Sequence, residues 1–508
     1  MKKYIIAGLA VLSLALTACE DEFDKINNKP DQPSDELISP DLQLTDGIMS
    51  TGYTTSSGAM AWYVSSYTEQ LVGVGGNQLY QTEMRSVTQT ASASTFNNEW
   101  NGTYGNILNL KKALAKAEPG AQYENQVDTR GMLKVMLALN YGLMTDAFGD
   151  IPASEAATEG IAHPKLDTQK SIYETVFSLL DGAIADFDEA AAAGTATAGA
   201  QDILYGGDVA KWKAFAYALK ARYKLHLQKV DSNAIADALA AAQEAKSLGF
   251  EGAEITGFTG IDSSSANPWA AYWYSRNYSA ASKTVADLLT ERNDPRLAVY
   301  ATDWTAGGNE VLSNKIATPG NQDDALVSYG QDKDAGFALP AWLNVYSYSQ
   351  GETASIHLLS KAELYFILAE TEQRTGAAYD QDLATAIAAS FADYGSFGVA
   401  LASTADQYVA SLASKLSADP LKEIMIQKYI SQCRDEQLET YNDYRRLEAN
   451  GESGKYVTLT NPNNRNNRLP QRLPYGNSDV VANPNVSQAY GDGMYVFTEK
   501  VWWAGGSR

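Results

Sequence analysis

Apolar residues recur at helical spacing through most of the chain from 41 to about 248. The clearest case is DVAKWKAFAYALKARYKLHLQK, in which Trp212, Phe215 and Leu219 fall on one face of a helix because three or four positions separate them. Several neighbouring segments show the same spacing, and each ends in Gly, Pro or a polar cluster. The pattern therefore predicts successive amphipathic helices joined by short turns.

The remainder of the chain divides into three parts with different patterns. Residues 249–351 are rich in Gly, Asn, Ser and aromatic residues, and only SKTVADLLTE predicts a short helix there. Helical spacing returns over 352–450, and the tail 451–508 is irregular but ends in the apolar stretch YVFTEKVWW. Paired helices rich in Ala and Tyr are typical of tetratricopeptide-like repeats, although no strict repeat is present. We predict a mainly α single domain over 41–508, in which the loop-rich region 249–351 is of the kind that usually carries function.

The N-terminal residues 1–18 have the outline of a secretory signal peptide, because Lys2 and Lys3 precede an apolar run too short to span a membrane. The run ends in Leu-Thr-Ala-Cys, which resembles the lipobox of bacterial lipoproteins. We therefore predict that Cys19 carries the lipid anchor and that 19–40, acidic and then rich in Asn and Pro, forms a flexible tether. The acidic residues after Cys19 resemble the signal that exports lipoproteins to the cell surface in Bacteroidetes-type bacteria.

The composition narrows the possible ligands. A net charge of -22 makes the chain repel nucleic acid phosphates and anionic lipid head groups, so no nucleic acid partner is expected. Once Cys19 is lipidated, Cys433 has no partner in the chain, so the fold depends on its core and not on disulfides. The 30 Tyr and 9 Trp against 13 Phe favour rings that combine a flat apolar face with a polar edge. Such rings suit ligand-binding surfaces.

Five segments together resemble the SusD/RagB family of nutrient-binding outer-membrane lipoproteins. They are RLPYGNSDVVANPNV (472–486), MTDAFGDIPASEA (144–156), ERNDPRLAVY (291–300), KAELYFILAE (361–370) and ETYNDYRRLE (439–448). In the last segment Tyr441 and Tyr444 stand where Trp is more usual in the family. The segments follow the family's order along nearly the whole chain.

The resemblance implies a tetratricopeptide-like helical protein that sits on the outer membrane and binds a nutrient outside the cell. The nutrient would be an oligosaccharide or, as in some branches of the family, an oligopeptide. It also implies a partner, a TonB-dependent outer-membrane transporter of the SusC type, to which the nutrient is delivered.

Binding a sugar without catalysis needs flat aromatic faces and planar amide or guanidinium groups that bridge hydroxyls. The loop-rich stretch NPWAAYWYSRNYS offers both. The predicted ligand-binding residues are Trp269, Tyr272, Trp273, Tyr274, Arg276 and Asn277 in this stretch, Asn77 and Tyr80 in GVGGNQLYQ, and Trp304 and Trp342 in two further segments. Each of these rings could instead pack in the core. Trp62, Tyr63 and Tyr67 are assigned to helix packing, because Tyr63 and Tyr67 are four positions apart and so share one helix face. Trp100 and Tyr104 have the same spacing and are assigned to packing as well.

Two other functions remain open alternatives. A surface glycoside hydrolase needs a carboxylate pair, whose separation is a property of the fold. The sequence has no H-E-x-x-H, C-x-x-C, G-x-S-x-G or complete Walker motif, so we predict no catalytic residue, no cofactor and no metal site apart from one Ca²⁺ candidate. Asp332 and Asp334 offer a candidate Ca²⁺ site in a loop. A protein-interaction scaffold is the second alternative, and it would bury the aromatic cluster of 269–274 or turn it toward a protein.

Overall fold

The structure is a computed structural model, and it describes residues 37–73, 78–158, 160–260, 264–276, 279–301, 316–321 and 349–508. The α-helices are α2 (Pro40–Ser50), α3 (Ala59–Tyr67), α4 (Gln78–Glu83), α5 (Val87–Thr90), α6 (Asn97–Ala117), α7 (Val127–Phe148), α8 (Gln169–Ala193), α9 (Val209–His226), α10 (Ala234–Ser247), α11 (Pro268–Arg276), α12 (Lys283–Glu291), α13 (Leu297–Tyr300), α16 (Ser349–Glu352), α17 (Lys361–Thr375), α18 (Asp380–Gly395), α19 (Ala405–Ser411), α20 (Ala413–Ala418), α21 (Pro420–Ser431), α22 (Gln437–Ala449), α23 (Asn477–Ala482), α24 (Pro484–Tyr490) and α25 (Tyr495–Thr498). A π-helical turn, η2 (Thr51–Ser56), joins α2 to α3, and a 3-10 turn, η9 (Trp502–Ala504), lies near the end of the chain. The predicted mainly α fold is confirmed.

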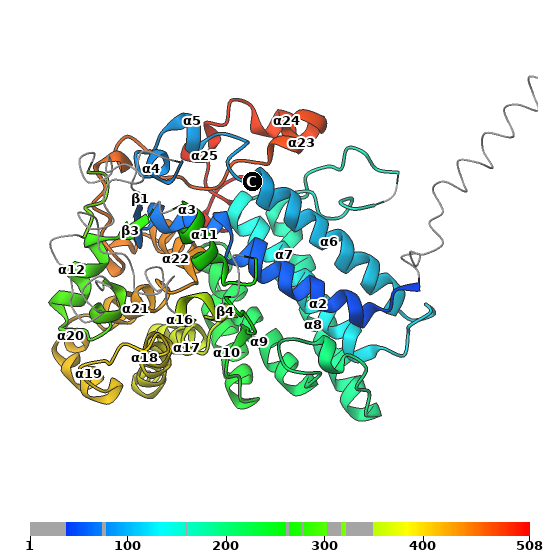
Figure 1. The fold of residues 1–508 in the computed structure, drawn as a ribbon, viewed down its shortest axis with the longest axis horizontal. Coiled ribbons are helices and arrows are strands. Elements are labelled where there is room, and N and C mark those ends of the chain that lie inside the picture. The colour runs from blue at the N-terminus through cyan, green and yellow to red at the C-terminus, as the bar shows by residue number, and fades with distance from the viewer. Residues whose placement is uncertain are drawn as a thin grey trace, which may run out of the picture.

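The helices α6 to α10 form a stack in which each packs against the next, and α17 continues it by packing against α10, α18 and α21 (Figure 1). Local sequence determines where these helices begin and end. The Asp208 carboxylate caps α9 by accepting hydrogen bonds from two backbone N–H groups, and Gly194 ends α8 in the left-handed conformation. The predicted stripe of Trp212, Phe215 and Leu219 is fully buried. The helices expected from the apolar spacing over 41–248 are therefore present.

In the described residues, four short strands form two separate antiparallel ribbons that join distant segments. Strand β1 (Leu71–Gly73) pairs with β3 (Ser279–Ala281), and β2 (Ala253–Ile255) pairs with β4 (Ile356–Leu359). In the second ribbon Glu254 lies opposite His357. Each ribbon pairs one strand of the region 249–351 with a strand from outside that region.

One expectation about the region 249–351 is wrong. The aromatic stretch predicted as loop forms the helix α11, in addition to the expected helix α12. The prediction gave more weight to the Asn, Pro and Ser around these rings and overlooked that Trp269, Tyr272 and Trp273 fall at i, i+3 and i+4, which is helical spacing. The tail also holds three short helices, α23 to α25, and the burial of Trp503 shows that it packs back onto the body as expected.

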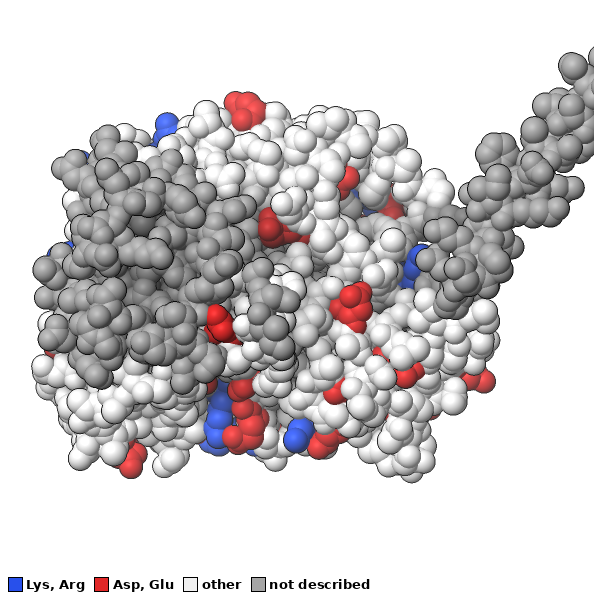
Figure 2. All heavy atoms as spheres, viewed as in Figure 1, with Lys and Arg blue, Asp and Glu red and all other residues white. Residues whose placement is uncertain are grey.

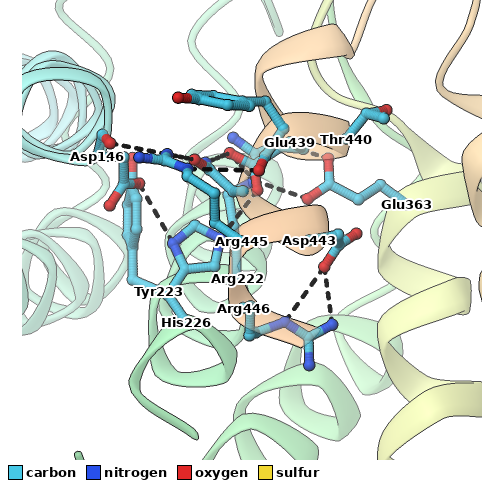
Figure 3. Close-up of polar contacts among 12 residues, drawn as sticks. Asp146, Arg222, Tyr223, His226, Glu363, Glu439, Thr440, Asp443, Arg445 and Arg446 are labelled. Carbon is cyan, nitrogen blue, oxygen red and sulfur yellow. Dashed lines mark hydrogen bonds and ion pairs between the residues drawn. The ribbon is translucent and has the colours of Figure 1, made fainter. Parts of the chain in front are cut away.

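A buried network of charged residues joins α7, α9, α17 and α22, whose side chains point toward one another in Figure 3. Arg222 binds both carboxylate oxygens of Glu363 at 2.7 and 2.5 Å. The Arg446 guanidinium similarly donates to both oxygens of Glu370, at 2.7 and 2.8 Å. Paired guanidinium and carboxylate groups of this geometry satisfy each other where water is excluded. The network therefore connects α22 to helices α7, α9 and α17 of the stack.

No helix in the described ranges combines the length and the apolar character needed to cross a membrane.

Candidate ligand-binding site

Two adjoining hollows open between η2, α3, α6 and α11. The larger has a volume of about 520 Å³ and is lined by Tyr53, Thr54, Gly58, Ala59, Trp62, Asn98, Glu99, Gly102, Pro268, Ala271 and Tyr272. The smaller, of about 310 Å³, is lined by Ala59, Trp62, Tyr63, Gln78, Gln89, Ser94, Thr95, Asn98, Glu99 and Tyr272. We call the two together the aromatic cleft. Its volume is in the range of small-molecule sites.

The aromatic cleft is built around two stacked rings from different helices. Trp62 of α3 and Tyr272 of α11 have ring centroids 3.7 Å apart and an interplanar angle of 24°. Both rings are half-buried, and both line each hollow. Since each ring covers one face of the other, a ligand would meet their outer faces and edges. An extended ligand suits a ring pair that borders both hollows.

Trp269 supports this ring pair from behind. It stands one helical turn before Tyr272 on α11 and meets Trp62 edge to face, with centroids 6.1 Å apart. Only 1% of Trp269 is exposed. The expectation that Trp269 contacts a ligand is therefore corrected, because its ring belongs to the core.

The charge lining the aromatic cleft comes from one carboxylate. Glu99 near the start of α6 is the only charged residue among the described lining residues of the two hollows. Burial raises the pKa of Glu99, although the carboxylate accepts a hydrogen bond from the backbone N–H of Ala59 at the start of α3. The absence of Lys and Arg from this described lining disfavours anionic ligands. Figure 2 shows the same face as Figure 1, and basic side chains are few over its central part.

Neutral polar groups complete the lining. The Tyr63 hydroxyl donates to Oε1 of Gln78 at 3.2 Å, and the Gln89 side-chain amide donates to the Thr95 hydroxyl at 3.0 Å. The amide of Asn98 is exposed. Amides and hydroxyls of this kind donate and accept, as sugar hydroxyls do. The cleft thus combines flat apolar rings with neutral hydrogen-bonding groups.

The close approach of α6 to η2 depends on a glycine. A Cβ atom on Gly102 would lie 2.8 Å from Cγ2 of Thr54, which lines the larger hollow. A larger side chain at 102 would therefore push η2 away and change the shape of the hollow.

The predicted ligand-binding residues divide into three groups. Tyr272 lies in the aromatic cleft, whereas Tyr80 is half-buried on α4 and is not among the lining residues. Trp273, Tyr274 and Arg276 belong to α11, but their side chains lie outside the described part of the structure. The other predicted residues, Asn77, Asn277, Trp304, Trp342, Asp332, Asp334 and Cys19, lie outside the described residues.

Sequence reasoning missed Trp62 and Glu99. Tyr63 and Tyr67 are buried, as the i, i+4 spacing predicted, but Trp62 precedes Tyr63 and so lies off that stripe. This offset of one position from the buried stripe was the feature of the sequence that could have indicated a different role for Trp62. Trp100 is buried and Tyr104 donates to the carbonyl of Pro152, so the assignment of these two to packing agrees with the structure.

Among the residues that the structure describes, two clusters of His and carboxylate side chains have ligand atoms close enough to share a metal ion. In the first, which is fully buried, the His226 imidazole meets Asp146 at 3.2 Å and Glu439 at 2.9 Å. Burial alone would lower the pKa of His226, but the two carboxylates raise it to about 9, so the ring is an imidazolium at neutral pH. Hydrogen bonds from the Tyr173 hydroxyl and the Trp503 indole to Asp146 complete the cluster. In this state the cluster is a buried ion pair network.

Comparison with known proteins decides the family. The family described as "Starch-binding associating with outer membrane", SusD-like, matches residues 37–476. The chain belongs to the SusD-like family. This SusD-like protein is 34% identical to a SusD/RagB family protein from Bacteroides thetaiotaomicron, with a TM-score of 0.80, covering 93% of this chain and 100% of the other. The resemblance expected from the five sequence segments is confirmed.

More distant SusD homologs share the fold. A chitin-binding SusD homolog from Flavobacterium johnsoniae is 20% identical, with a TM-score of 0.69, covering 91% of this chain and 98% of the other. A SusD homolog from Bacteroides fragilis is also 20% identical, with a TM-score of 0.65 and coverage of 92% and 100%. No curated protein matches the sequence. At these identities the likeness carries the fold and not the ligand.

Proposed function

We propose that this SusD-like protein captures a neutral oligosaccharide in the aromatic cleft and delivers it to a TonB-dependent, SusC-like transporter in the outer membrane. The observation that carries the proposal is the stacked pair of Trp62 and Tyr272, which borders two open hollows whose described lining holds no cation. Pyranose rings present apolar C–H faces that stack on aromatic rings, and their hydroxyls suit the neutral amides nearby. The family description as starch-binding agrees with this ligand class.

An oligopeptide is the second candidate ligand. The Glu99 carboxylate could attract an amino terminus, but the described lining offers no Lys or Arg for the carboxyl terminus. A neutral sugar needs neither charge. The oligosaccharide is therefore the better fit.

Calorimetry of the lipid-free protein tests the ligand class. The panel contains neutral hexasaccharides with α- and β-linked glucose, β-linked N-acetylglucosamine and β-linked fructose, together with hexapeptides. We expect at least one neutral glycan to bind and Trp62→Ala to weaken it about tenfold, which corresponds to about 1.4 kcal/mol. Trp502→Ala is the matched control, because Trp502 is also half-buried but lies in η9 and not in the cleft.

Three results would contradict the proposal: binding of peptides alone, equal effects of Trp62→Ala and Trp502→Ala, or cleavage of a glycan by the purified protein. Cleavage of a glycan would support the alternative that the protein is a surface glycoside hydrolase. Circular dichroism of both variants establishes that they remain folded.

The location and the partner are tested in cells. Anchoring through Cys19 would place the protein in the outer-membrane fraction, and Cys19→Ala would release it from that fraction. Protease added to intact cells would digest a protein displayed on the surface. Purification from detergent-solubilised outer membranes, followed by mass spectrometry, would identify a TonB-dependent barrel if the proposed partner is correct.

A further inference from the structure

A second histidine cluster lies on the β2–β4 ribbon. Nε2 of His357 on β4 lies 3.1 Å from Oε1 of Glu254 on β2 and 3.6 Å from Oδ1 of Asp393 near the end of α18. One ligand atom from each of the three residues lies within 4.8 Å of the others. Three segments far apart in the sequence therefore present one nitrogen and two oxygens to the same point.

The two separations from Nε2 are close to those between ligand atoms of a tetrahedral metal site. Zn²⁺ binds imidazole nitrogen and carboxylate oxygen at roughly 2.0–2.2 Å, which places two ligand atoms of a tetrahedral site about 3.3 Å apart. The separations of 3.1 and 3.6 Å from Nε2 lie on either side of this value.

The imidazole of His357 is already oriented from its other side. The carboxylate of Asp435 accepts hydrogen bonds from the backbone N–H of His357 at 2.8 Å and from Nδ1 at 3.1 Å. A carboxylate that accepts from one ring nitrogen fixes the tautomer that leaves the other nitrogen able to bind a metal. Nε2 is thus directed at Glu254 and Asp393.

The charge and the exposure of the cluster also suit a divalent cation. Three carboxylates, Glu254, Asp393 and Asp435, and the Arg434 guanidinium next to Asp435 leave two negative charges around His357 once a bound cation has displaced the proton from Nε2. A divalent cation balances them. His357 is buried, whereas the side chains of Glu254 and Asp393 are 39% and 27% exposed, which provides an entry path and room for a water ligand.

We propose that Glu254, His357 and Asp393 form a binding site for a divalent transition cation, for which Zn²⁺ is the best fit, and that Asp435 is a positioning residue. The imidazole nitrogen favours Zn²⁺ over Ca²⁺ and Mg²⁺, which take oxygen ligands. The site is independent of the ligand proposed for the aromatic cleft.

The proposed site has a structural consequence for the aromatic cleft. Ile356 of the same ribbon lies against Gly52 of η2, with its Cδ1 3.7 Å from where a Cβ on Gly52 would be. Tyr53 and Thr54 of η2 line the larger hollow. A cation that joins the ribbon to α18 would therefore brace the wall of the cleft.

Zinc binding to the purified, tag-free protein, first treated with EDTA, tests the proposal. Equilibrium dialysis against ZnCl₂ should give one bound Zn²⁺ per chain. Glu254→Gln and Asp393→Asn keep the side-chain shapes, and each should weaken binding at least about tenfold. Glu251→Gln is the matched control, because this exposed carboxylate lies near β2 and pairs with Lys361 outside the cluster. It should leave the affinity unchanged.

The role of Asp435 needs a readout that reports on the metal itself. Co²⁺ bound in place of Zn²⁺ gives visible absorption bands that depend on its coordination. Asp435→Asn should weaken metal binding by about 10- to 100-fold and shift these bands. A purely structural role for Asp435 would leave the bands of the bound Co²⁺ where they are in the unsubstituted protein.

Thermal unfolding provides a second measurement. Zn²⁺ should raise the melting temperature of the unsubstituted protein and of Glu251→Gln, and it should not raise that of Glu254→Gln or Asp393→Asn. The proposal is overturned if no saturable binding occurs, if both variants bind Zn²⁺ like the unsubstituted protein, or if Ca²⁺ or Mg²⁺ displaces Zn²⁺ at equal concentration.

Discussion

The cluster around His226 and the aromatic cleft around Trp62 both join side chains from distant segments, but they differ in what surrounds their polar atoms. The cluster places its charges in the interior, where Asp146, Glu439 and neighbouring groups satisfy the imidazolium. The cleft places half-buried rings and neutral polar groups around open volume. Charges that are paired inside the protein hold the fold together, whereas rings that border open volume are available to a ligand.

Arg222→Met should give the largest effect on stability, because it removes the cation from the buried ion pair between Arg222 and Glu363. The change leaves Glu363, which is 1% exposed, without its bidentate guanidinium partner. Removing one member of a buried pair lowers the free energy of unfolding by about 3–5 kcal/mol. Urea unfolding followed by circular dichroism measures this loss.

Lys283→Met is the control for that substitution, since Lys283 forms an exposed pair with Asp287. It should change the free energy of unfolding by less than about 1 kcal/mol. Glycan affinity of the folded Arg222→Met protein should match that of the unsubstituted protein. Equal destabilisation by the two substitutions would remove the distinction between buried and exposed pairs.

Raising the pH should weaken the buried cluster around His226. The pKa of His226 is about 9 in the folded protein against 6.5 as its ordinary value, so the folded state holds the proton more tightly. The stabilisation is fully present below pH 6.5 and is lost as the pH rises through about 9. It amounts to at most about 3–4 kcal/mol, since each pKa unit corresponds to about 1.4 kcal/mol.

The free energy of unfolding, measured from pH 6.5 to 10 with EDTA present, tests this dependence. The carboxylate of Asp435 and others also raise the pKa of His357, although its burial opposes the rise, so His357 contributes with the same sign. The difference between the unsubstituted protein and His226→Gln isolates the contribution of His226. A difference that stays constant across this range would show that His226 does not gain a proton on folding.

Tyr272→Leu tests the contribution of the aromatic cleft to ligand binding. Leucine keeps apolar volume but removes the flat ring that stacks on Trp62, so the affinity for a neutral glycan should fall by about 3- to 10-fold. Calorimetry measures the change. Tyr217→Leu is the matched control, because Tyr217 is half-buried on α9 outside the cleft and should leave the affinity unchanged. Equal glycan affinities of Tyr272→Leu and Tyr217→Leu would show that the ring pair does not contribute to ligand binding.

Glu99→Gln should have the smallest effect. The amide oxygen can still accept from the N–H of Ala59, so the affinity for a neutral glycan should change by less than about twofold. An anionic hexasaccharide, such as one of galacturonic acid, should bind about 2- to 5-fold more tightly once the carboxylate charge is removed. A large loss of neutral glycan affinity would instead indicate that Glu99 hydrogen-bonds the sugar.

The scaffold and the family followed from local features of the sequence. Helical spacing identified the buried stripe of Trp212, Phe215 and Leu219, because one face of an amphipathic helix must be buried wherever the helix packs. The segment 472–486 carried the resemblance to the family along with four other segments. By contrast, α11 was taken for a loop because its surroundings are rich in Asn, Pro and Ser, although Trp269, Tyr272 and Trp273 have the spacing of one helical face.

The sites were decided by tertiary structure. His226 and Glu439 are 213 positions apart, and no spacing in the sequence indicates that a second carboxylate meets the same imidazole. Trp62 looked like a core residue until packing placed it against Tyr272 beside open volume. Periodicity along a chain reports which face of a helix is buried, but which distant side chains meet depends on how the helices are arranged in space.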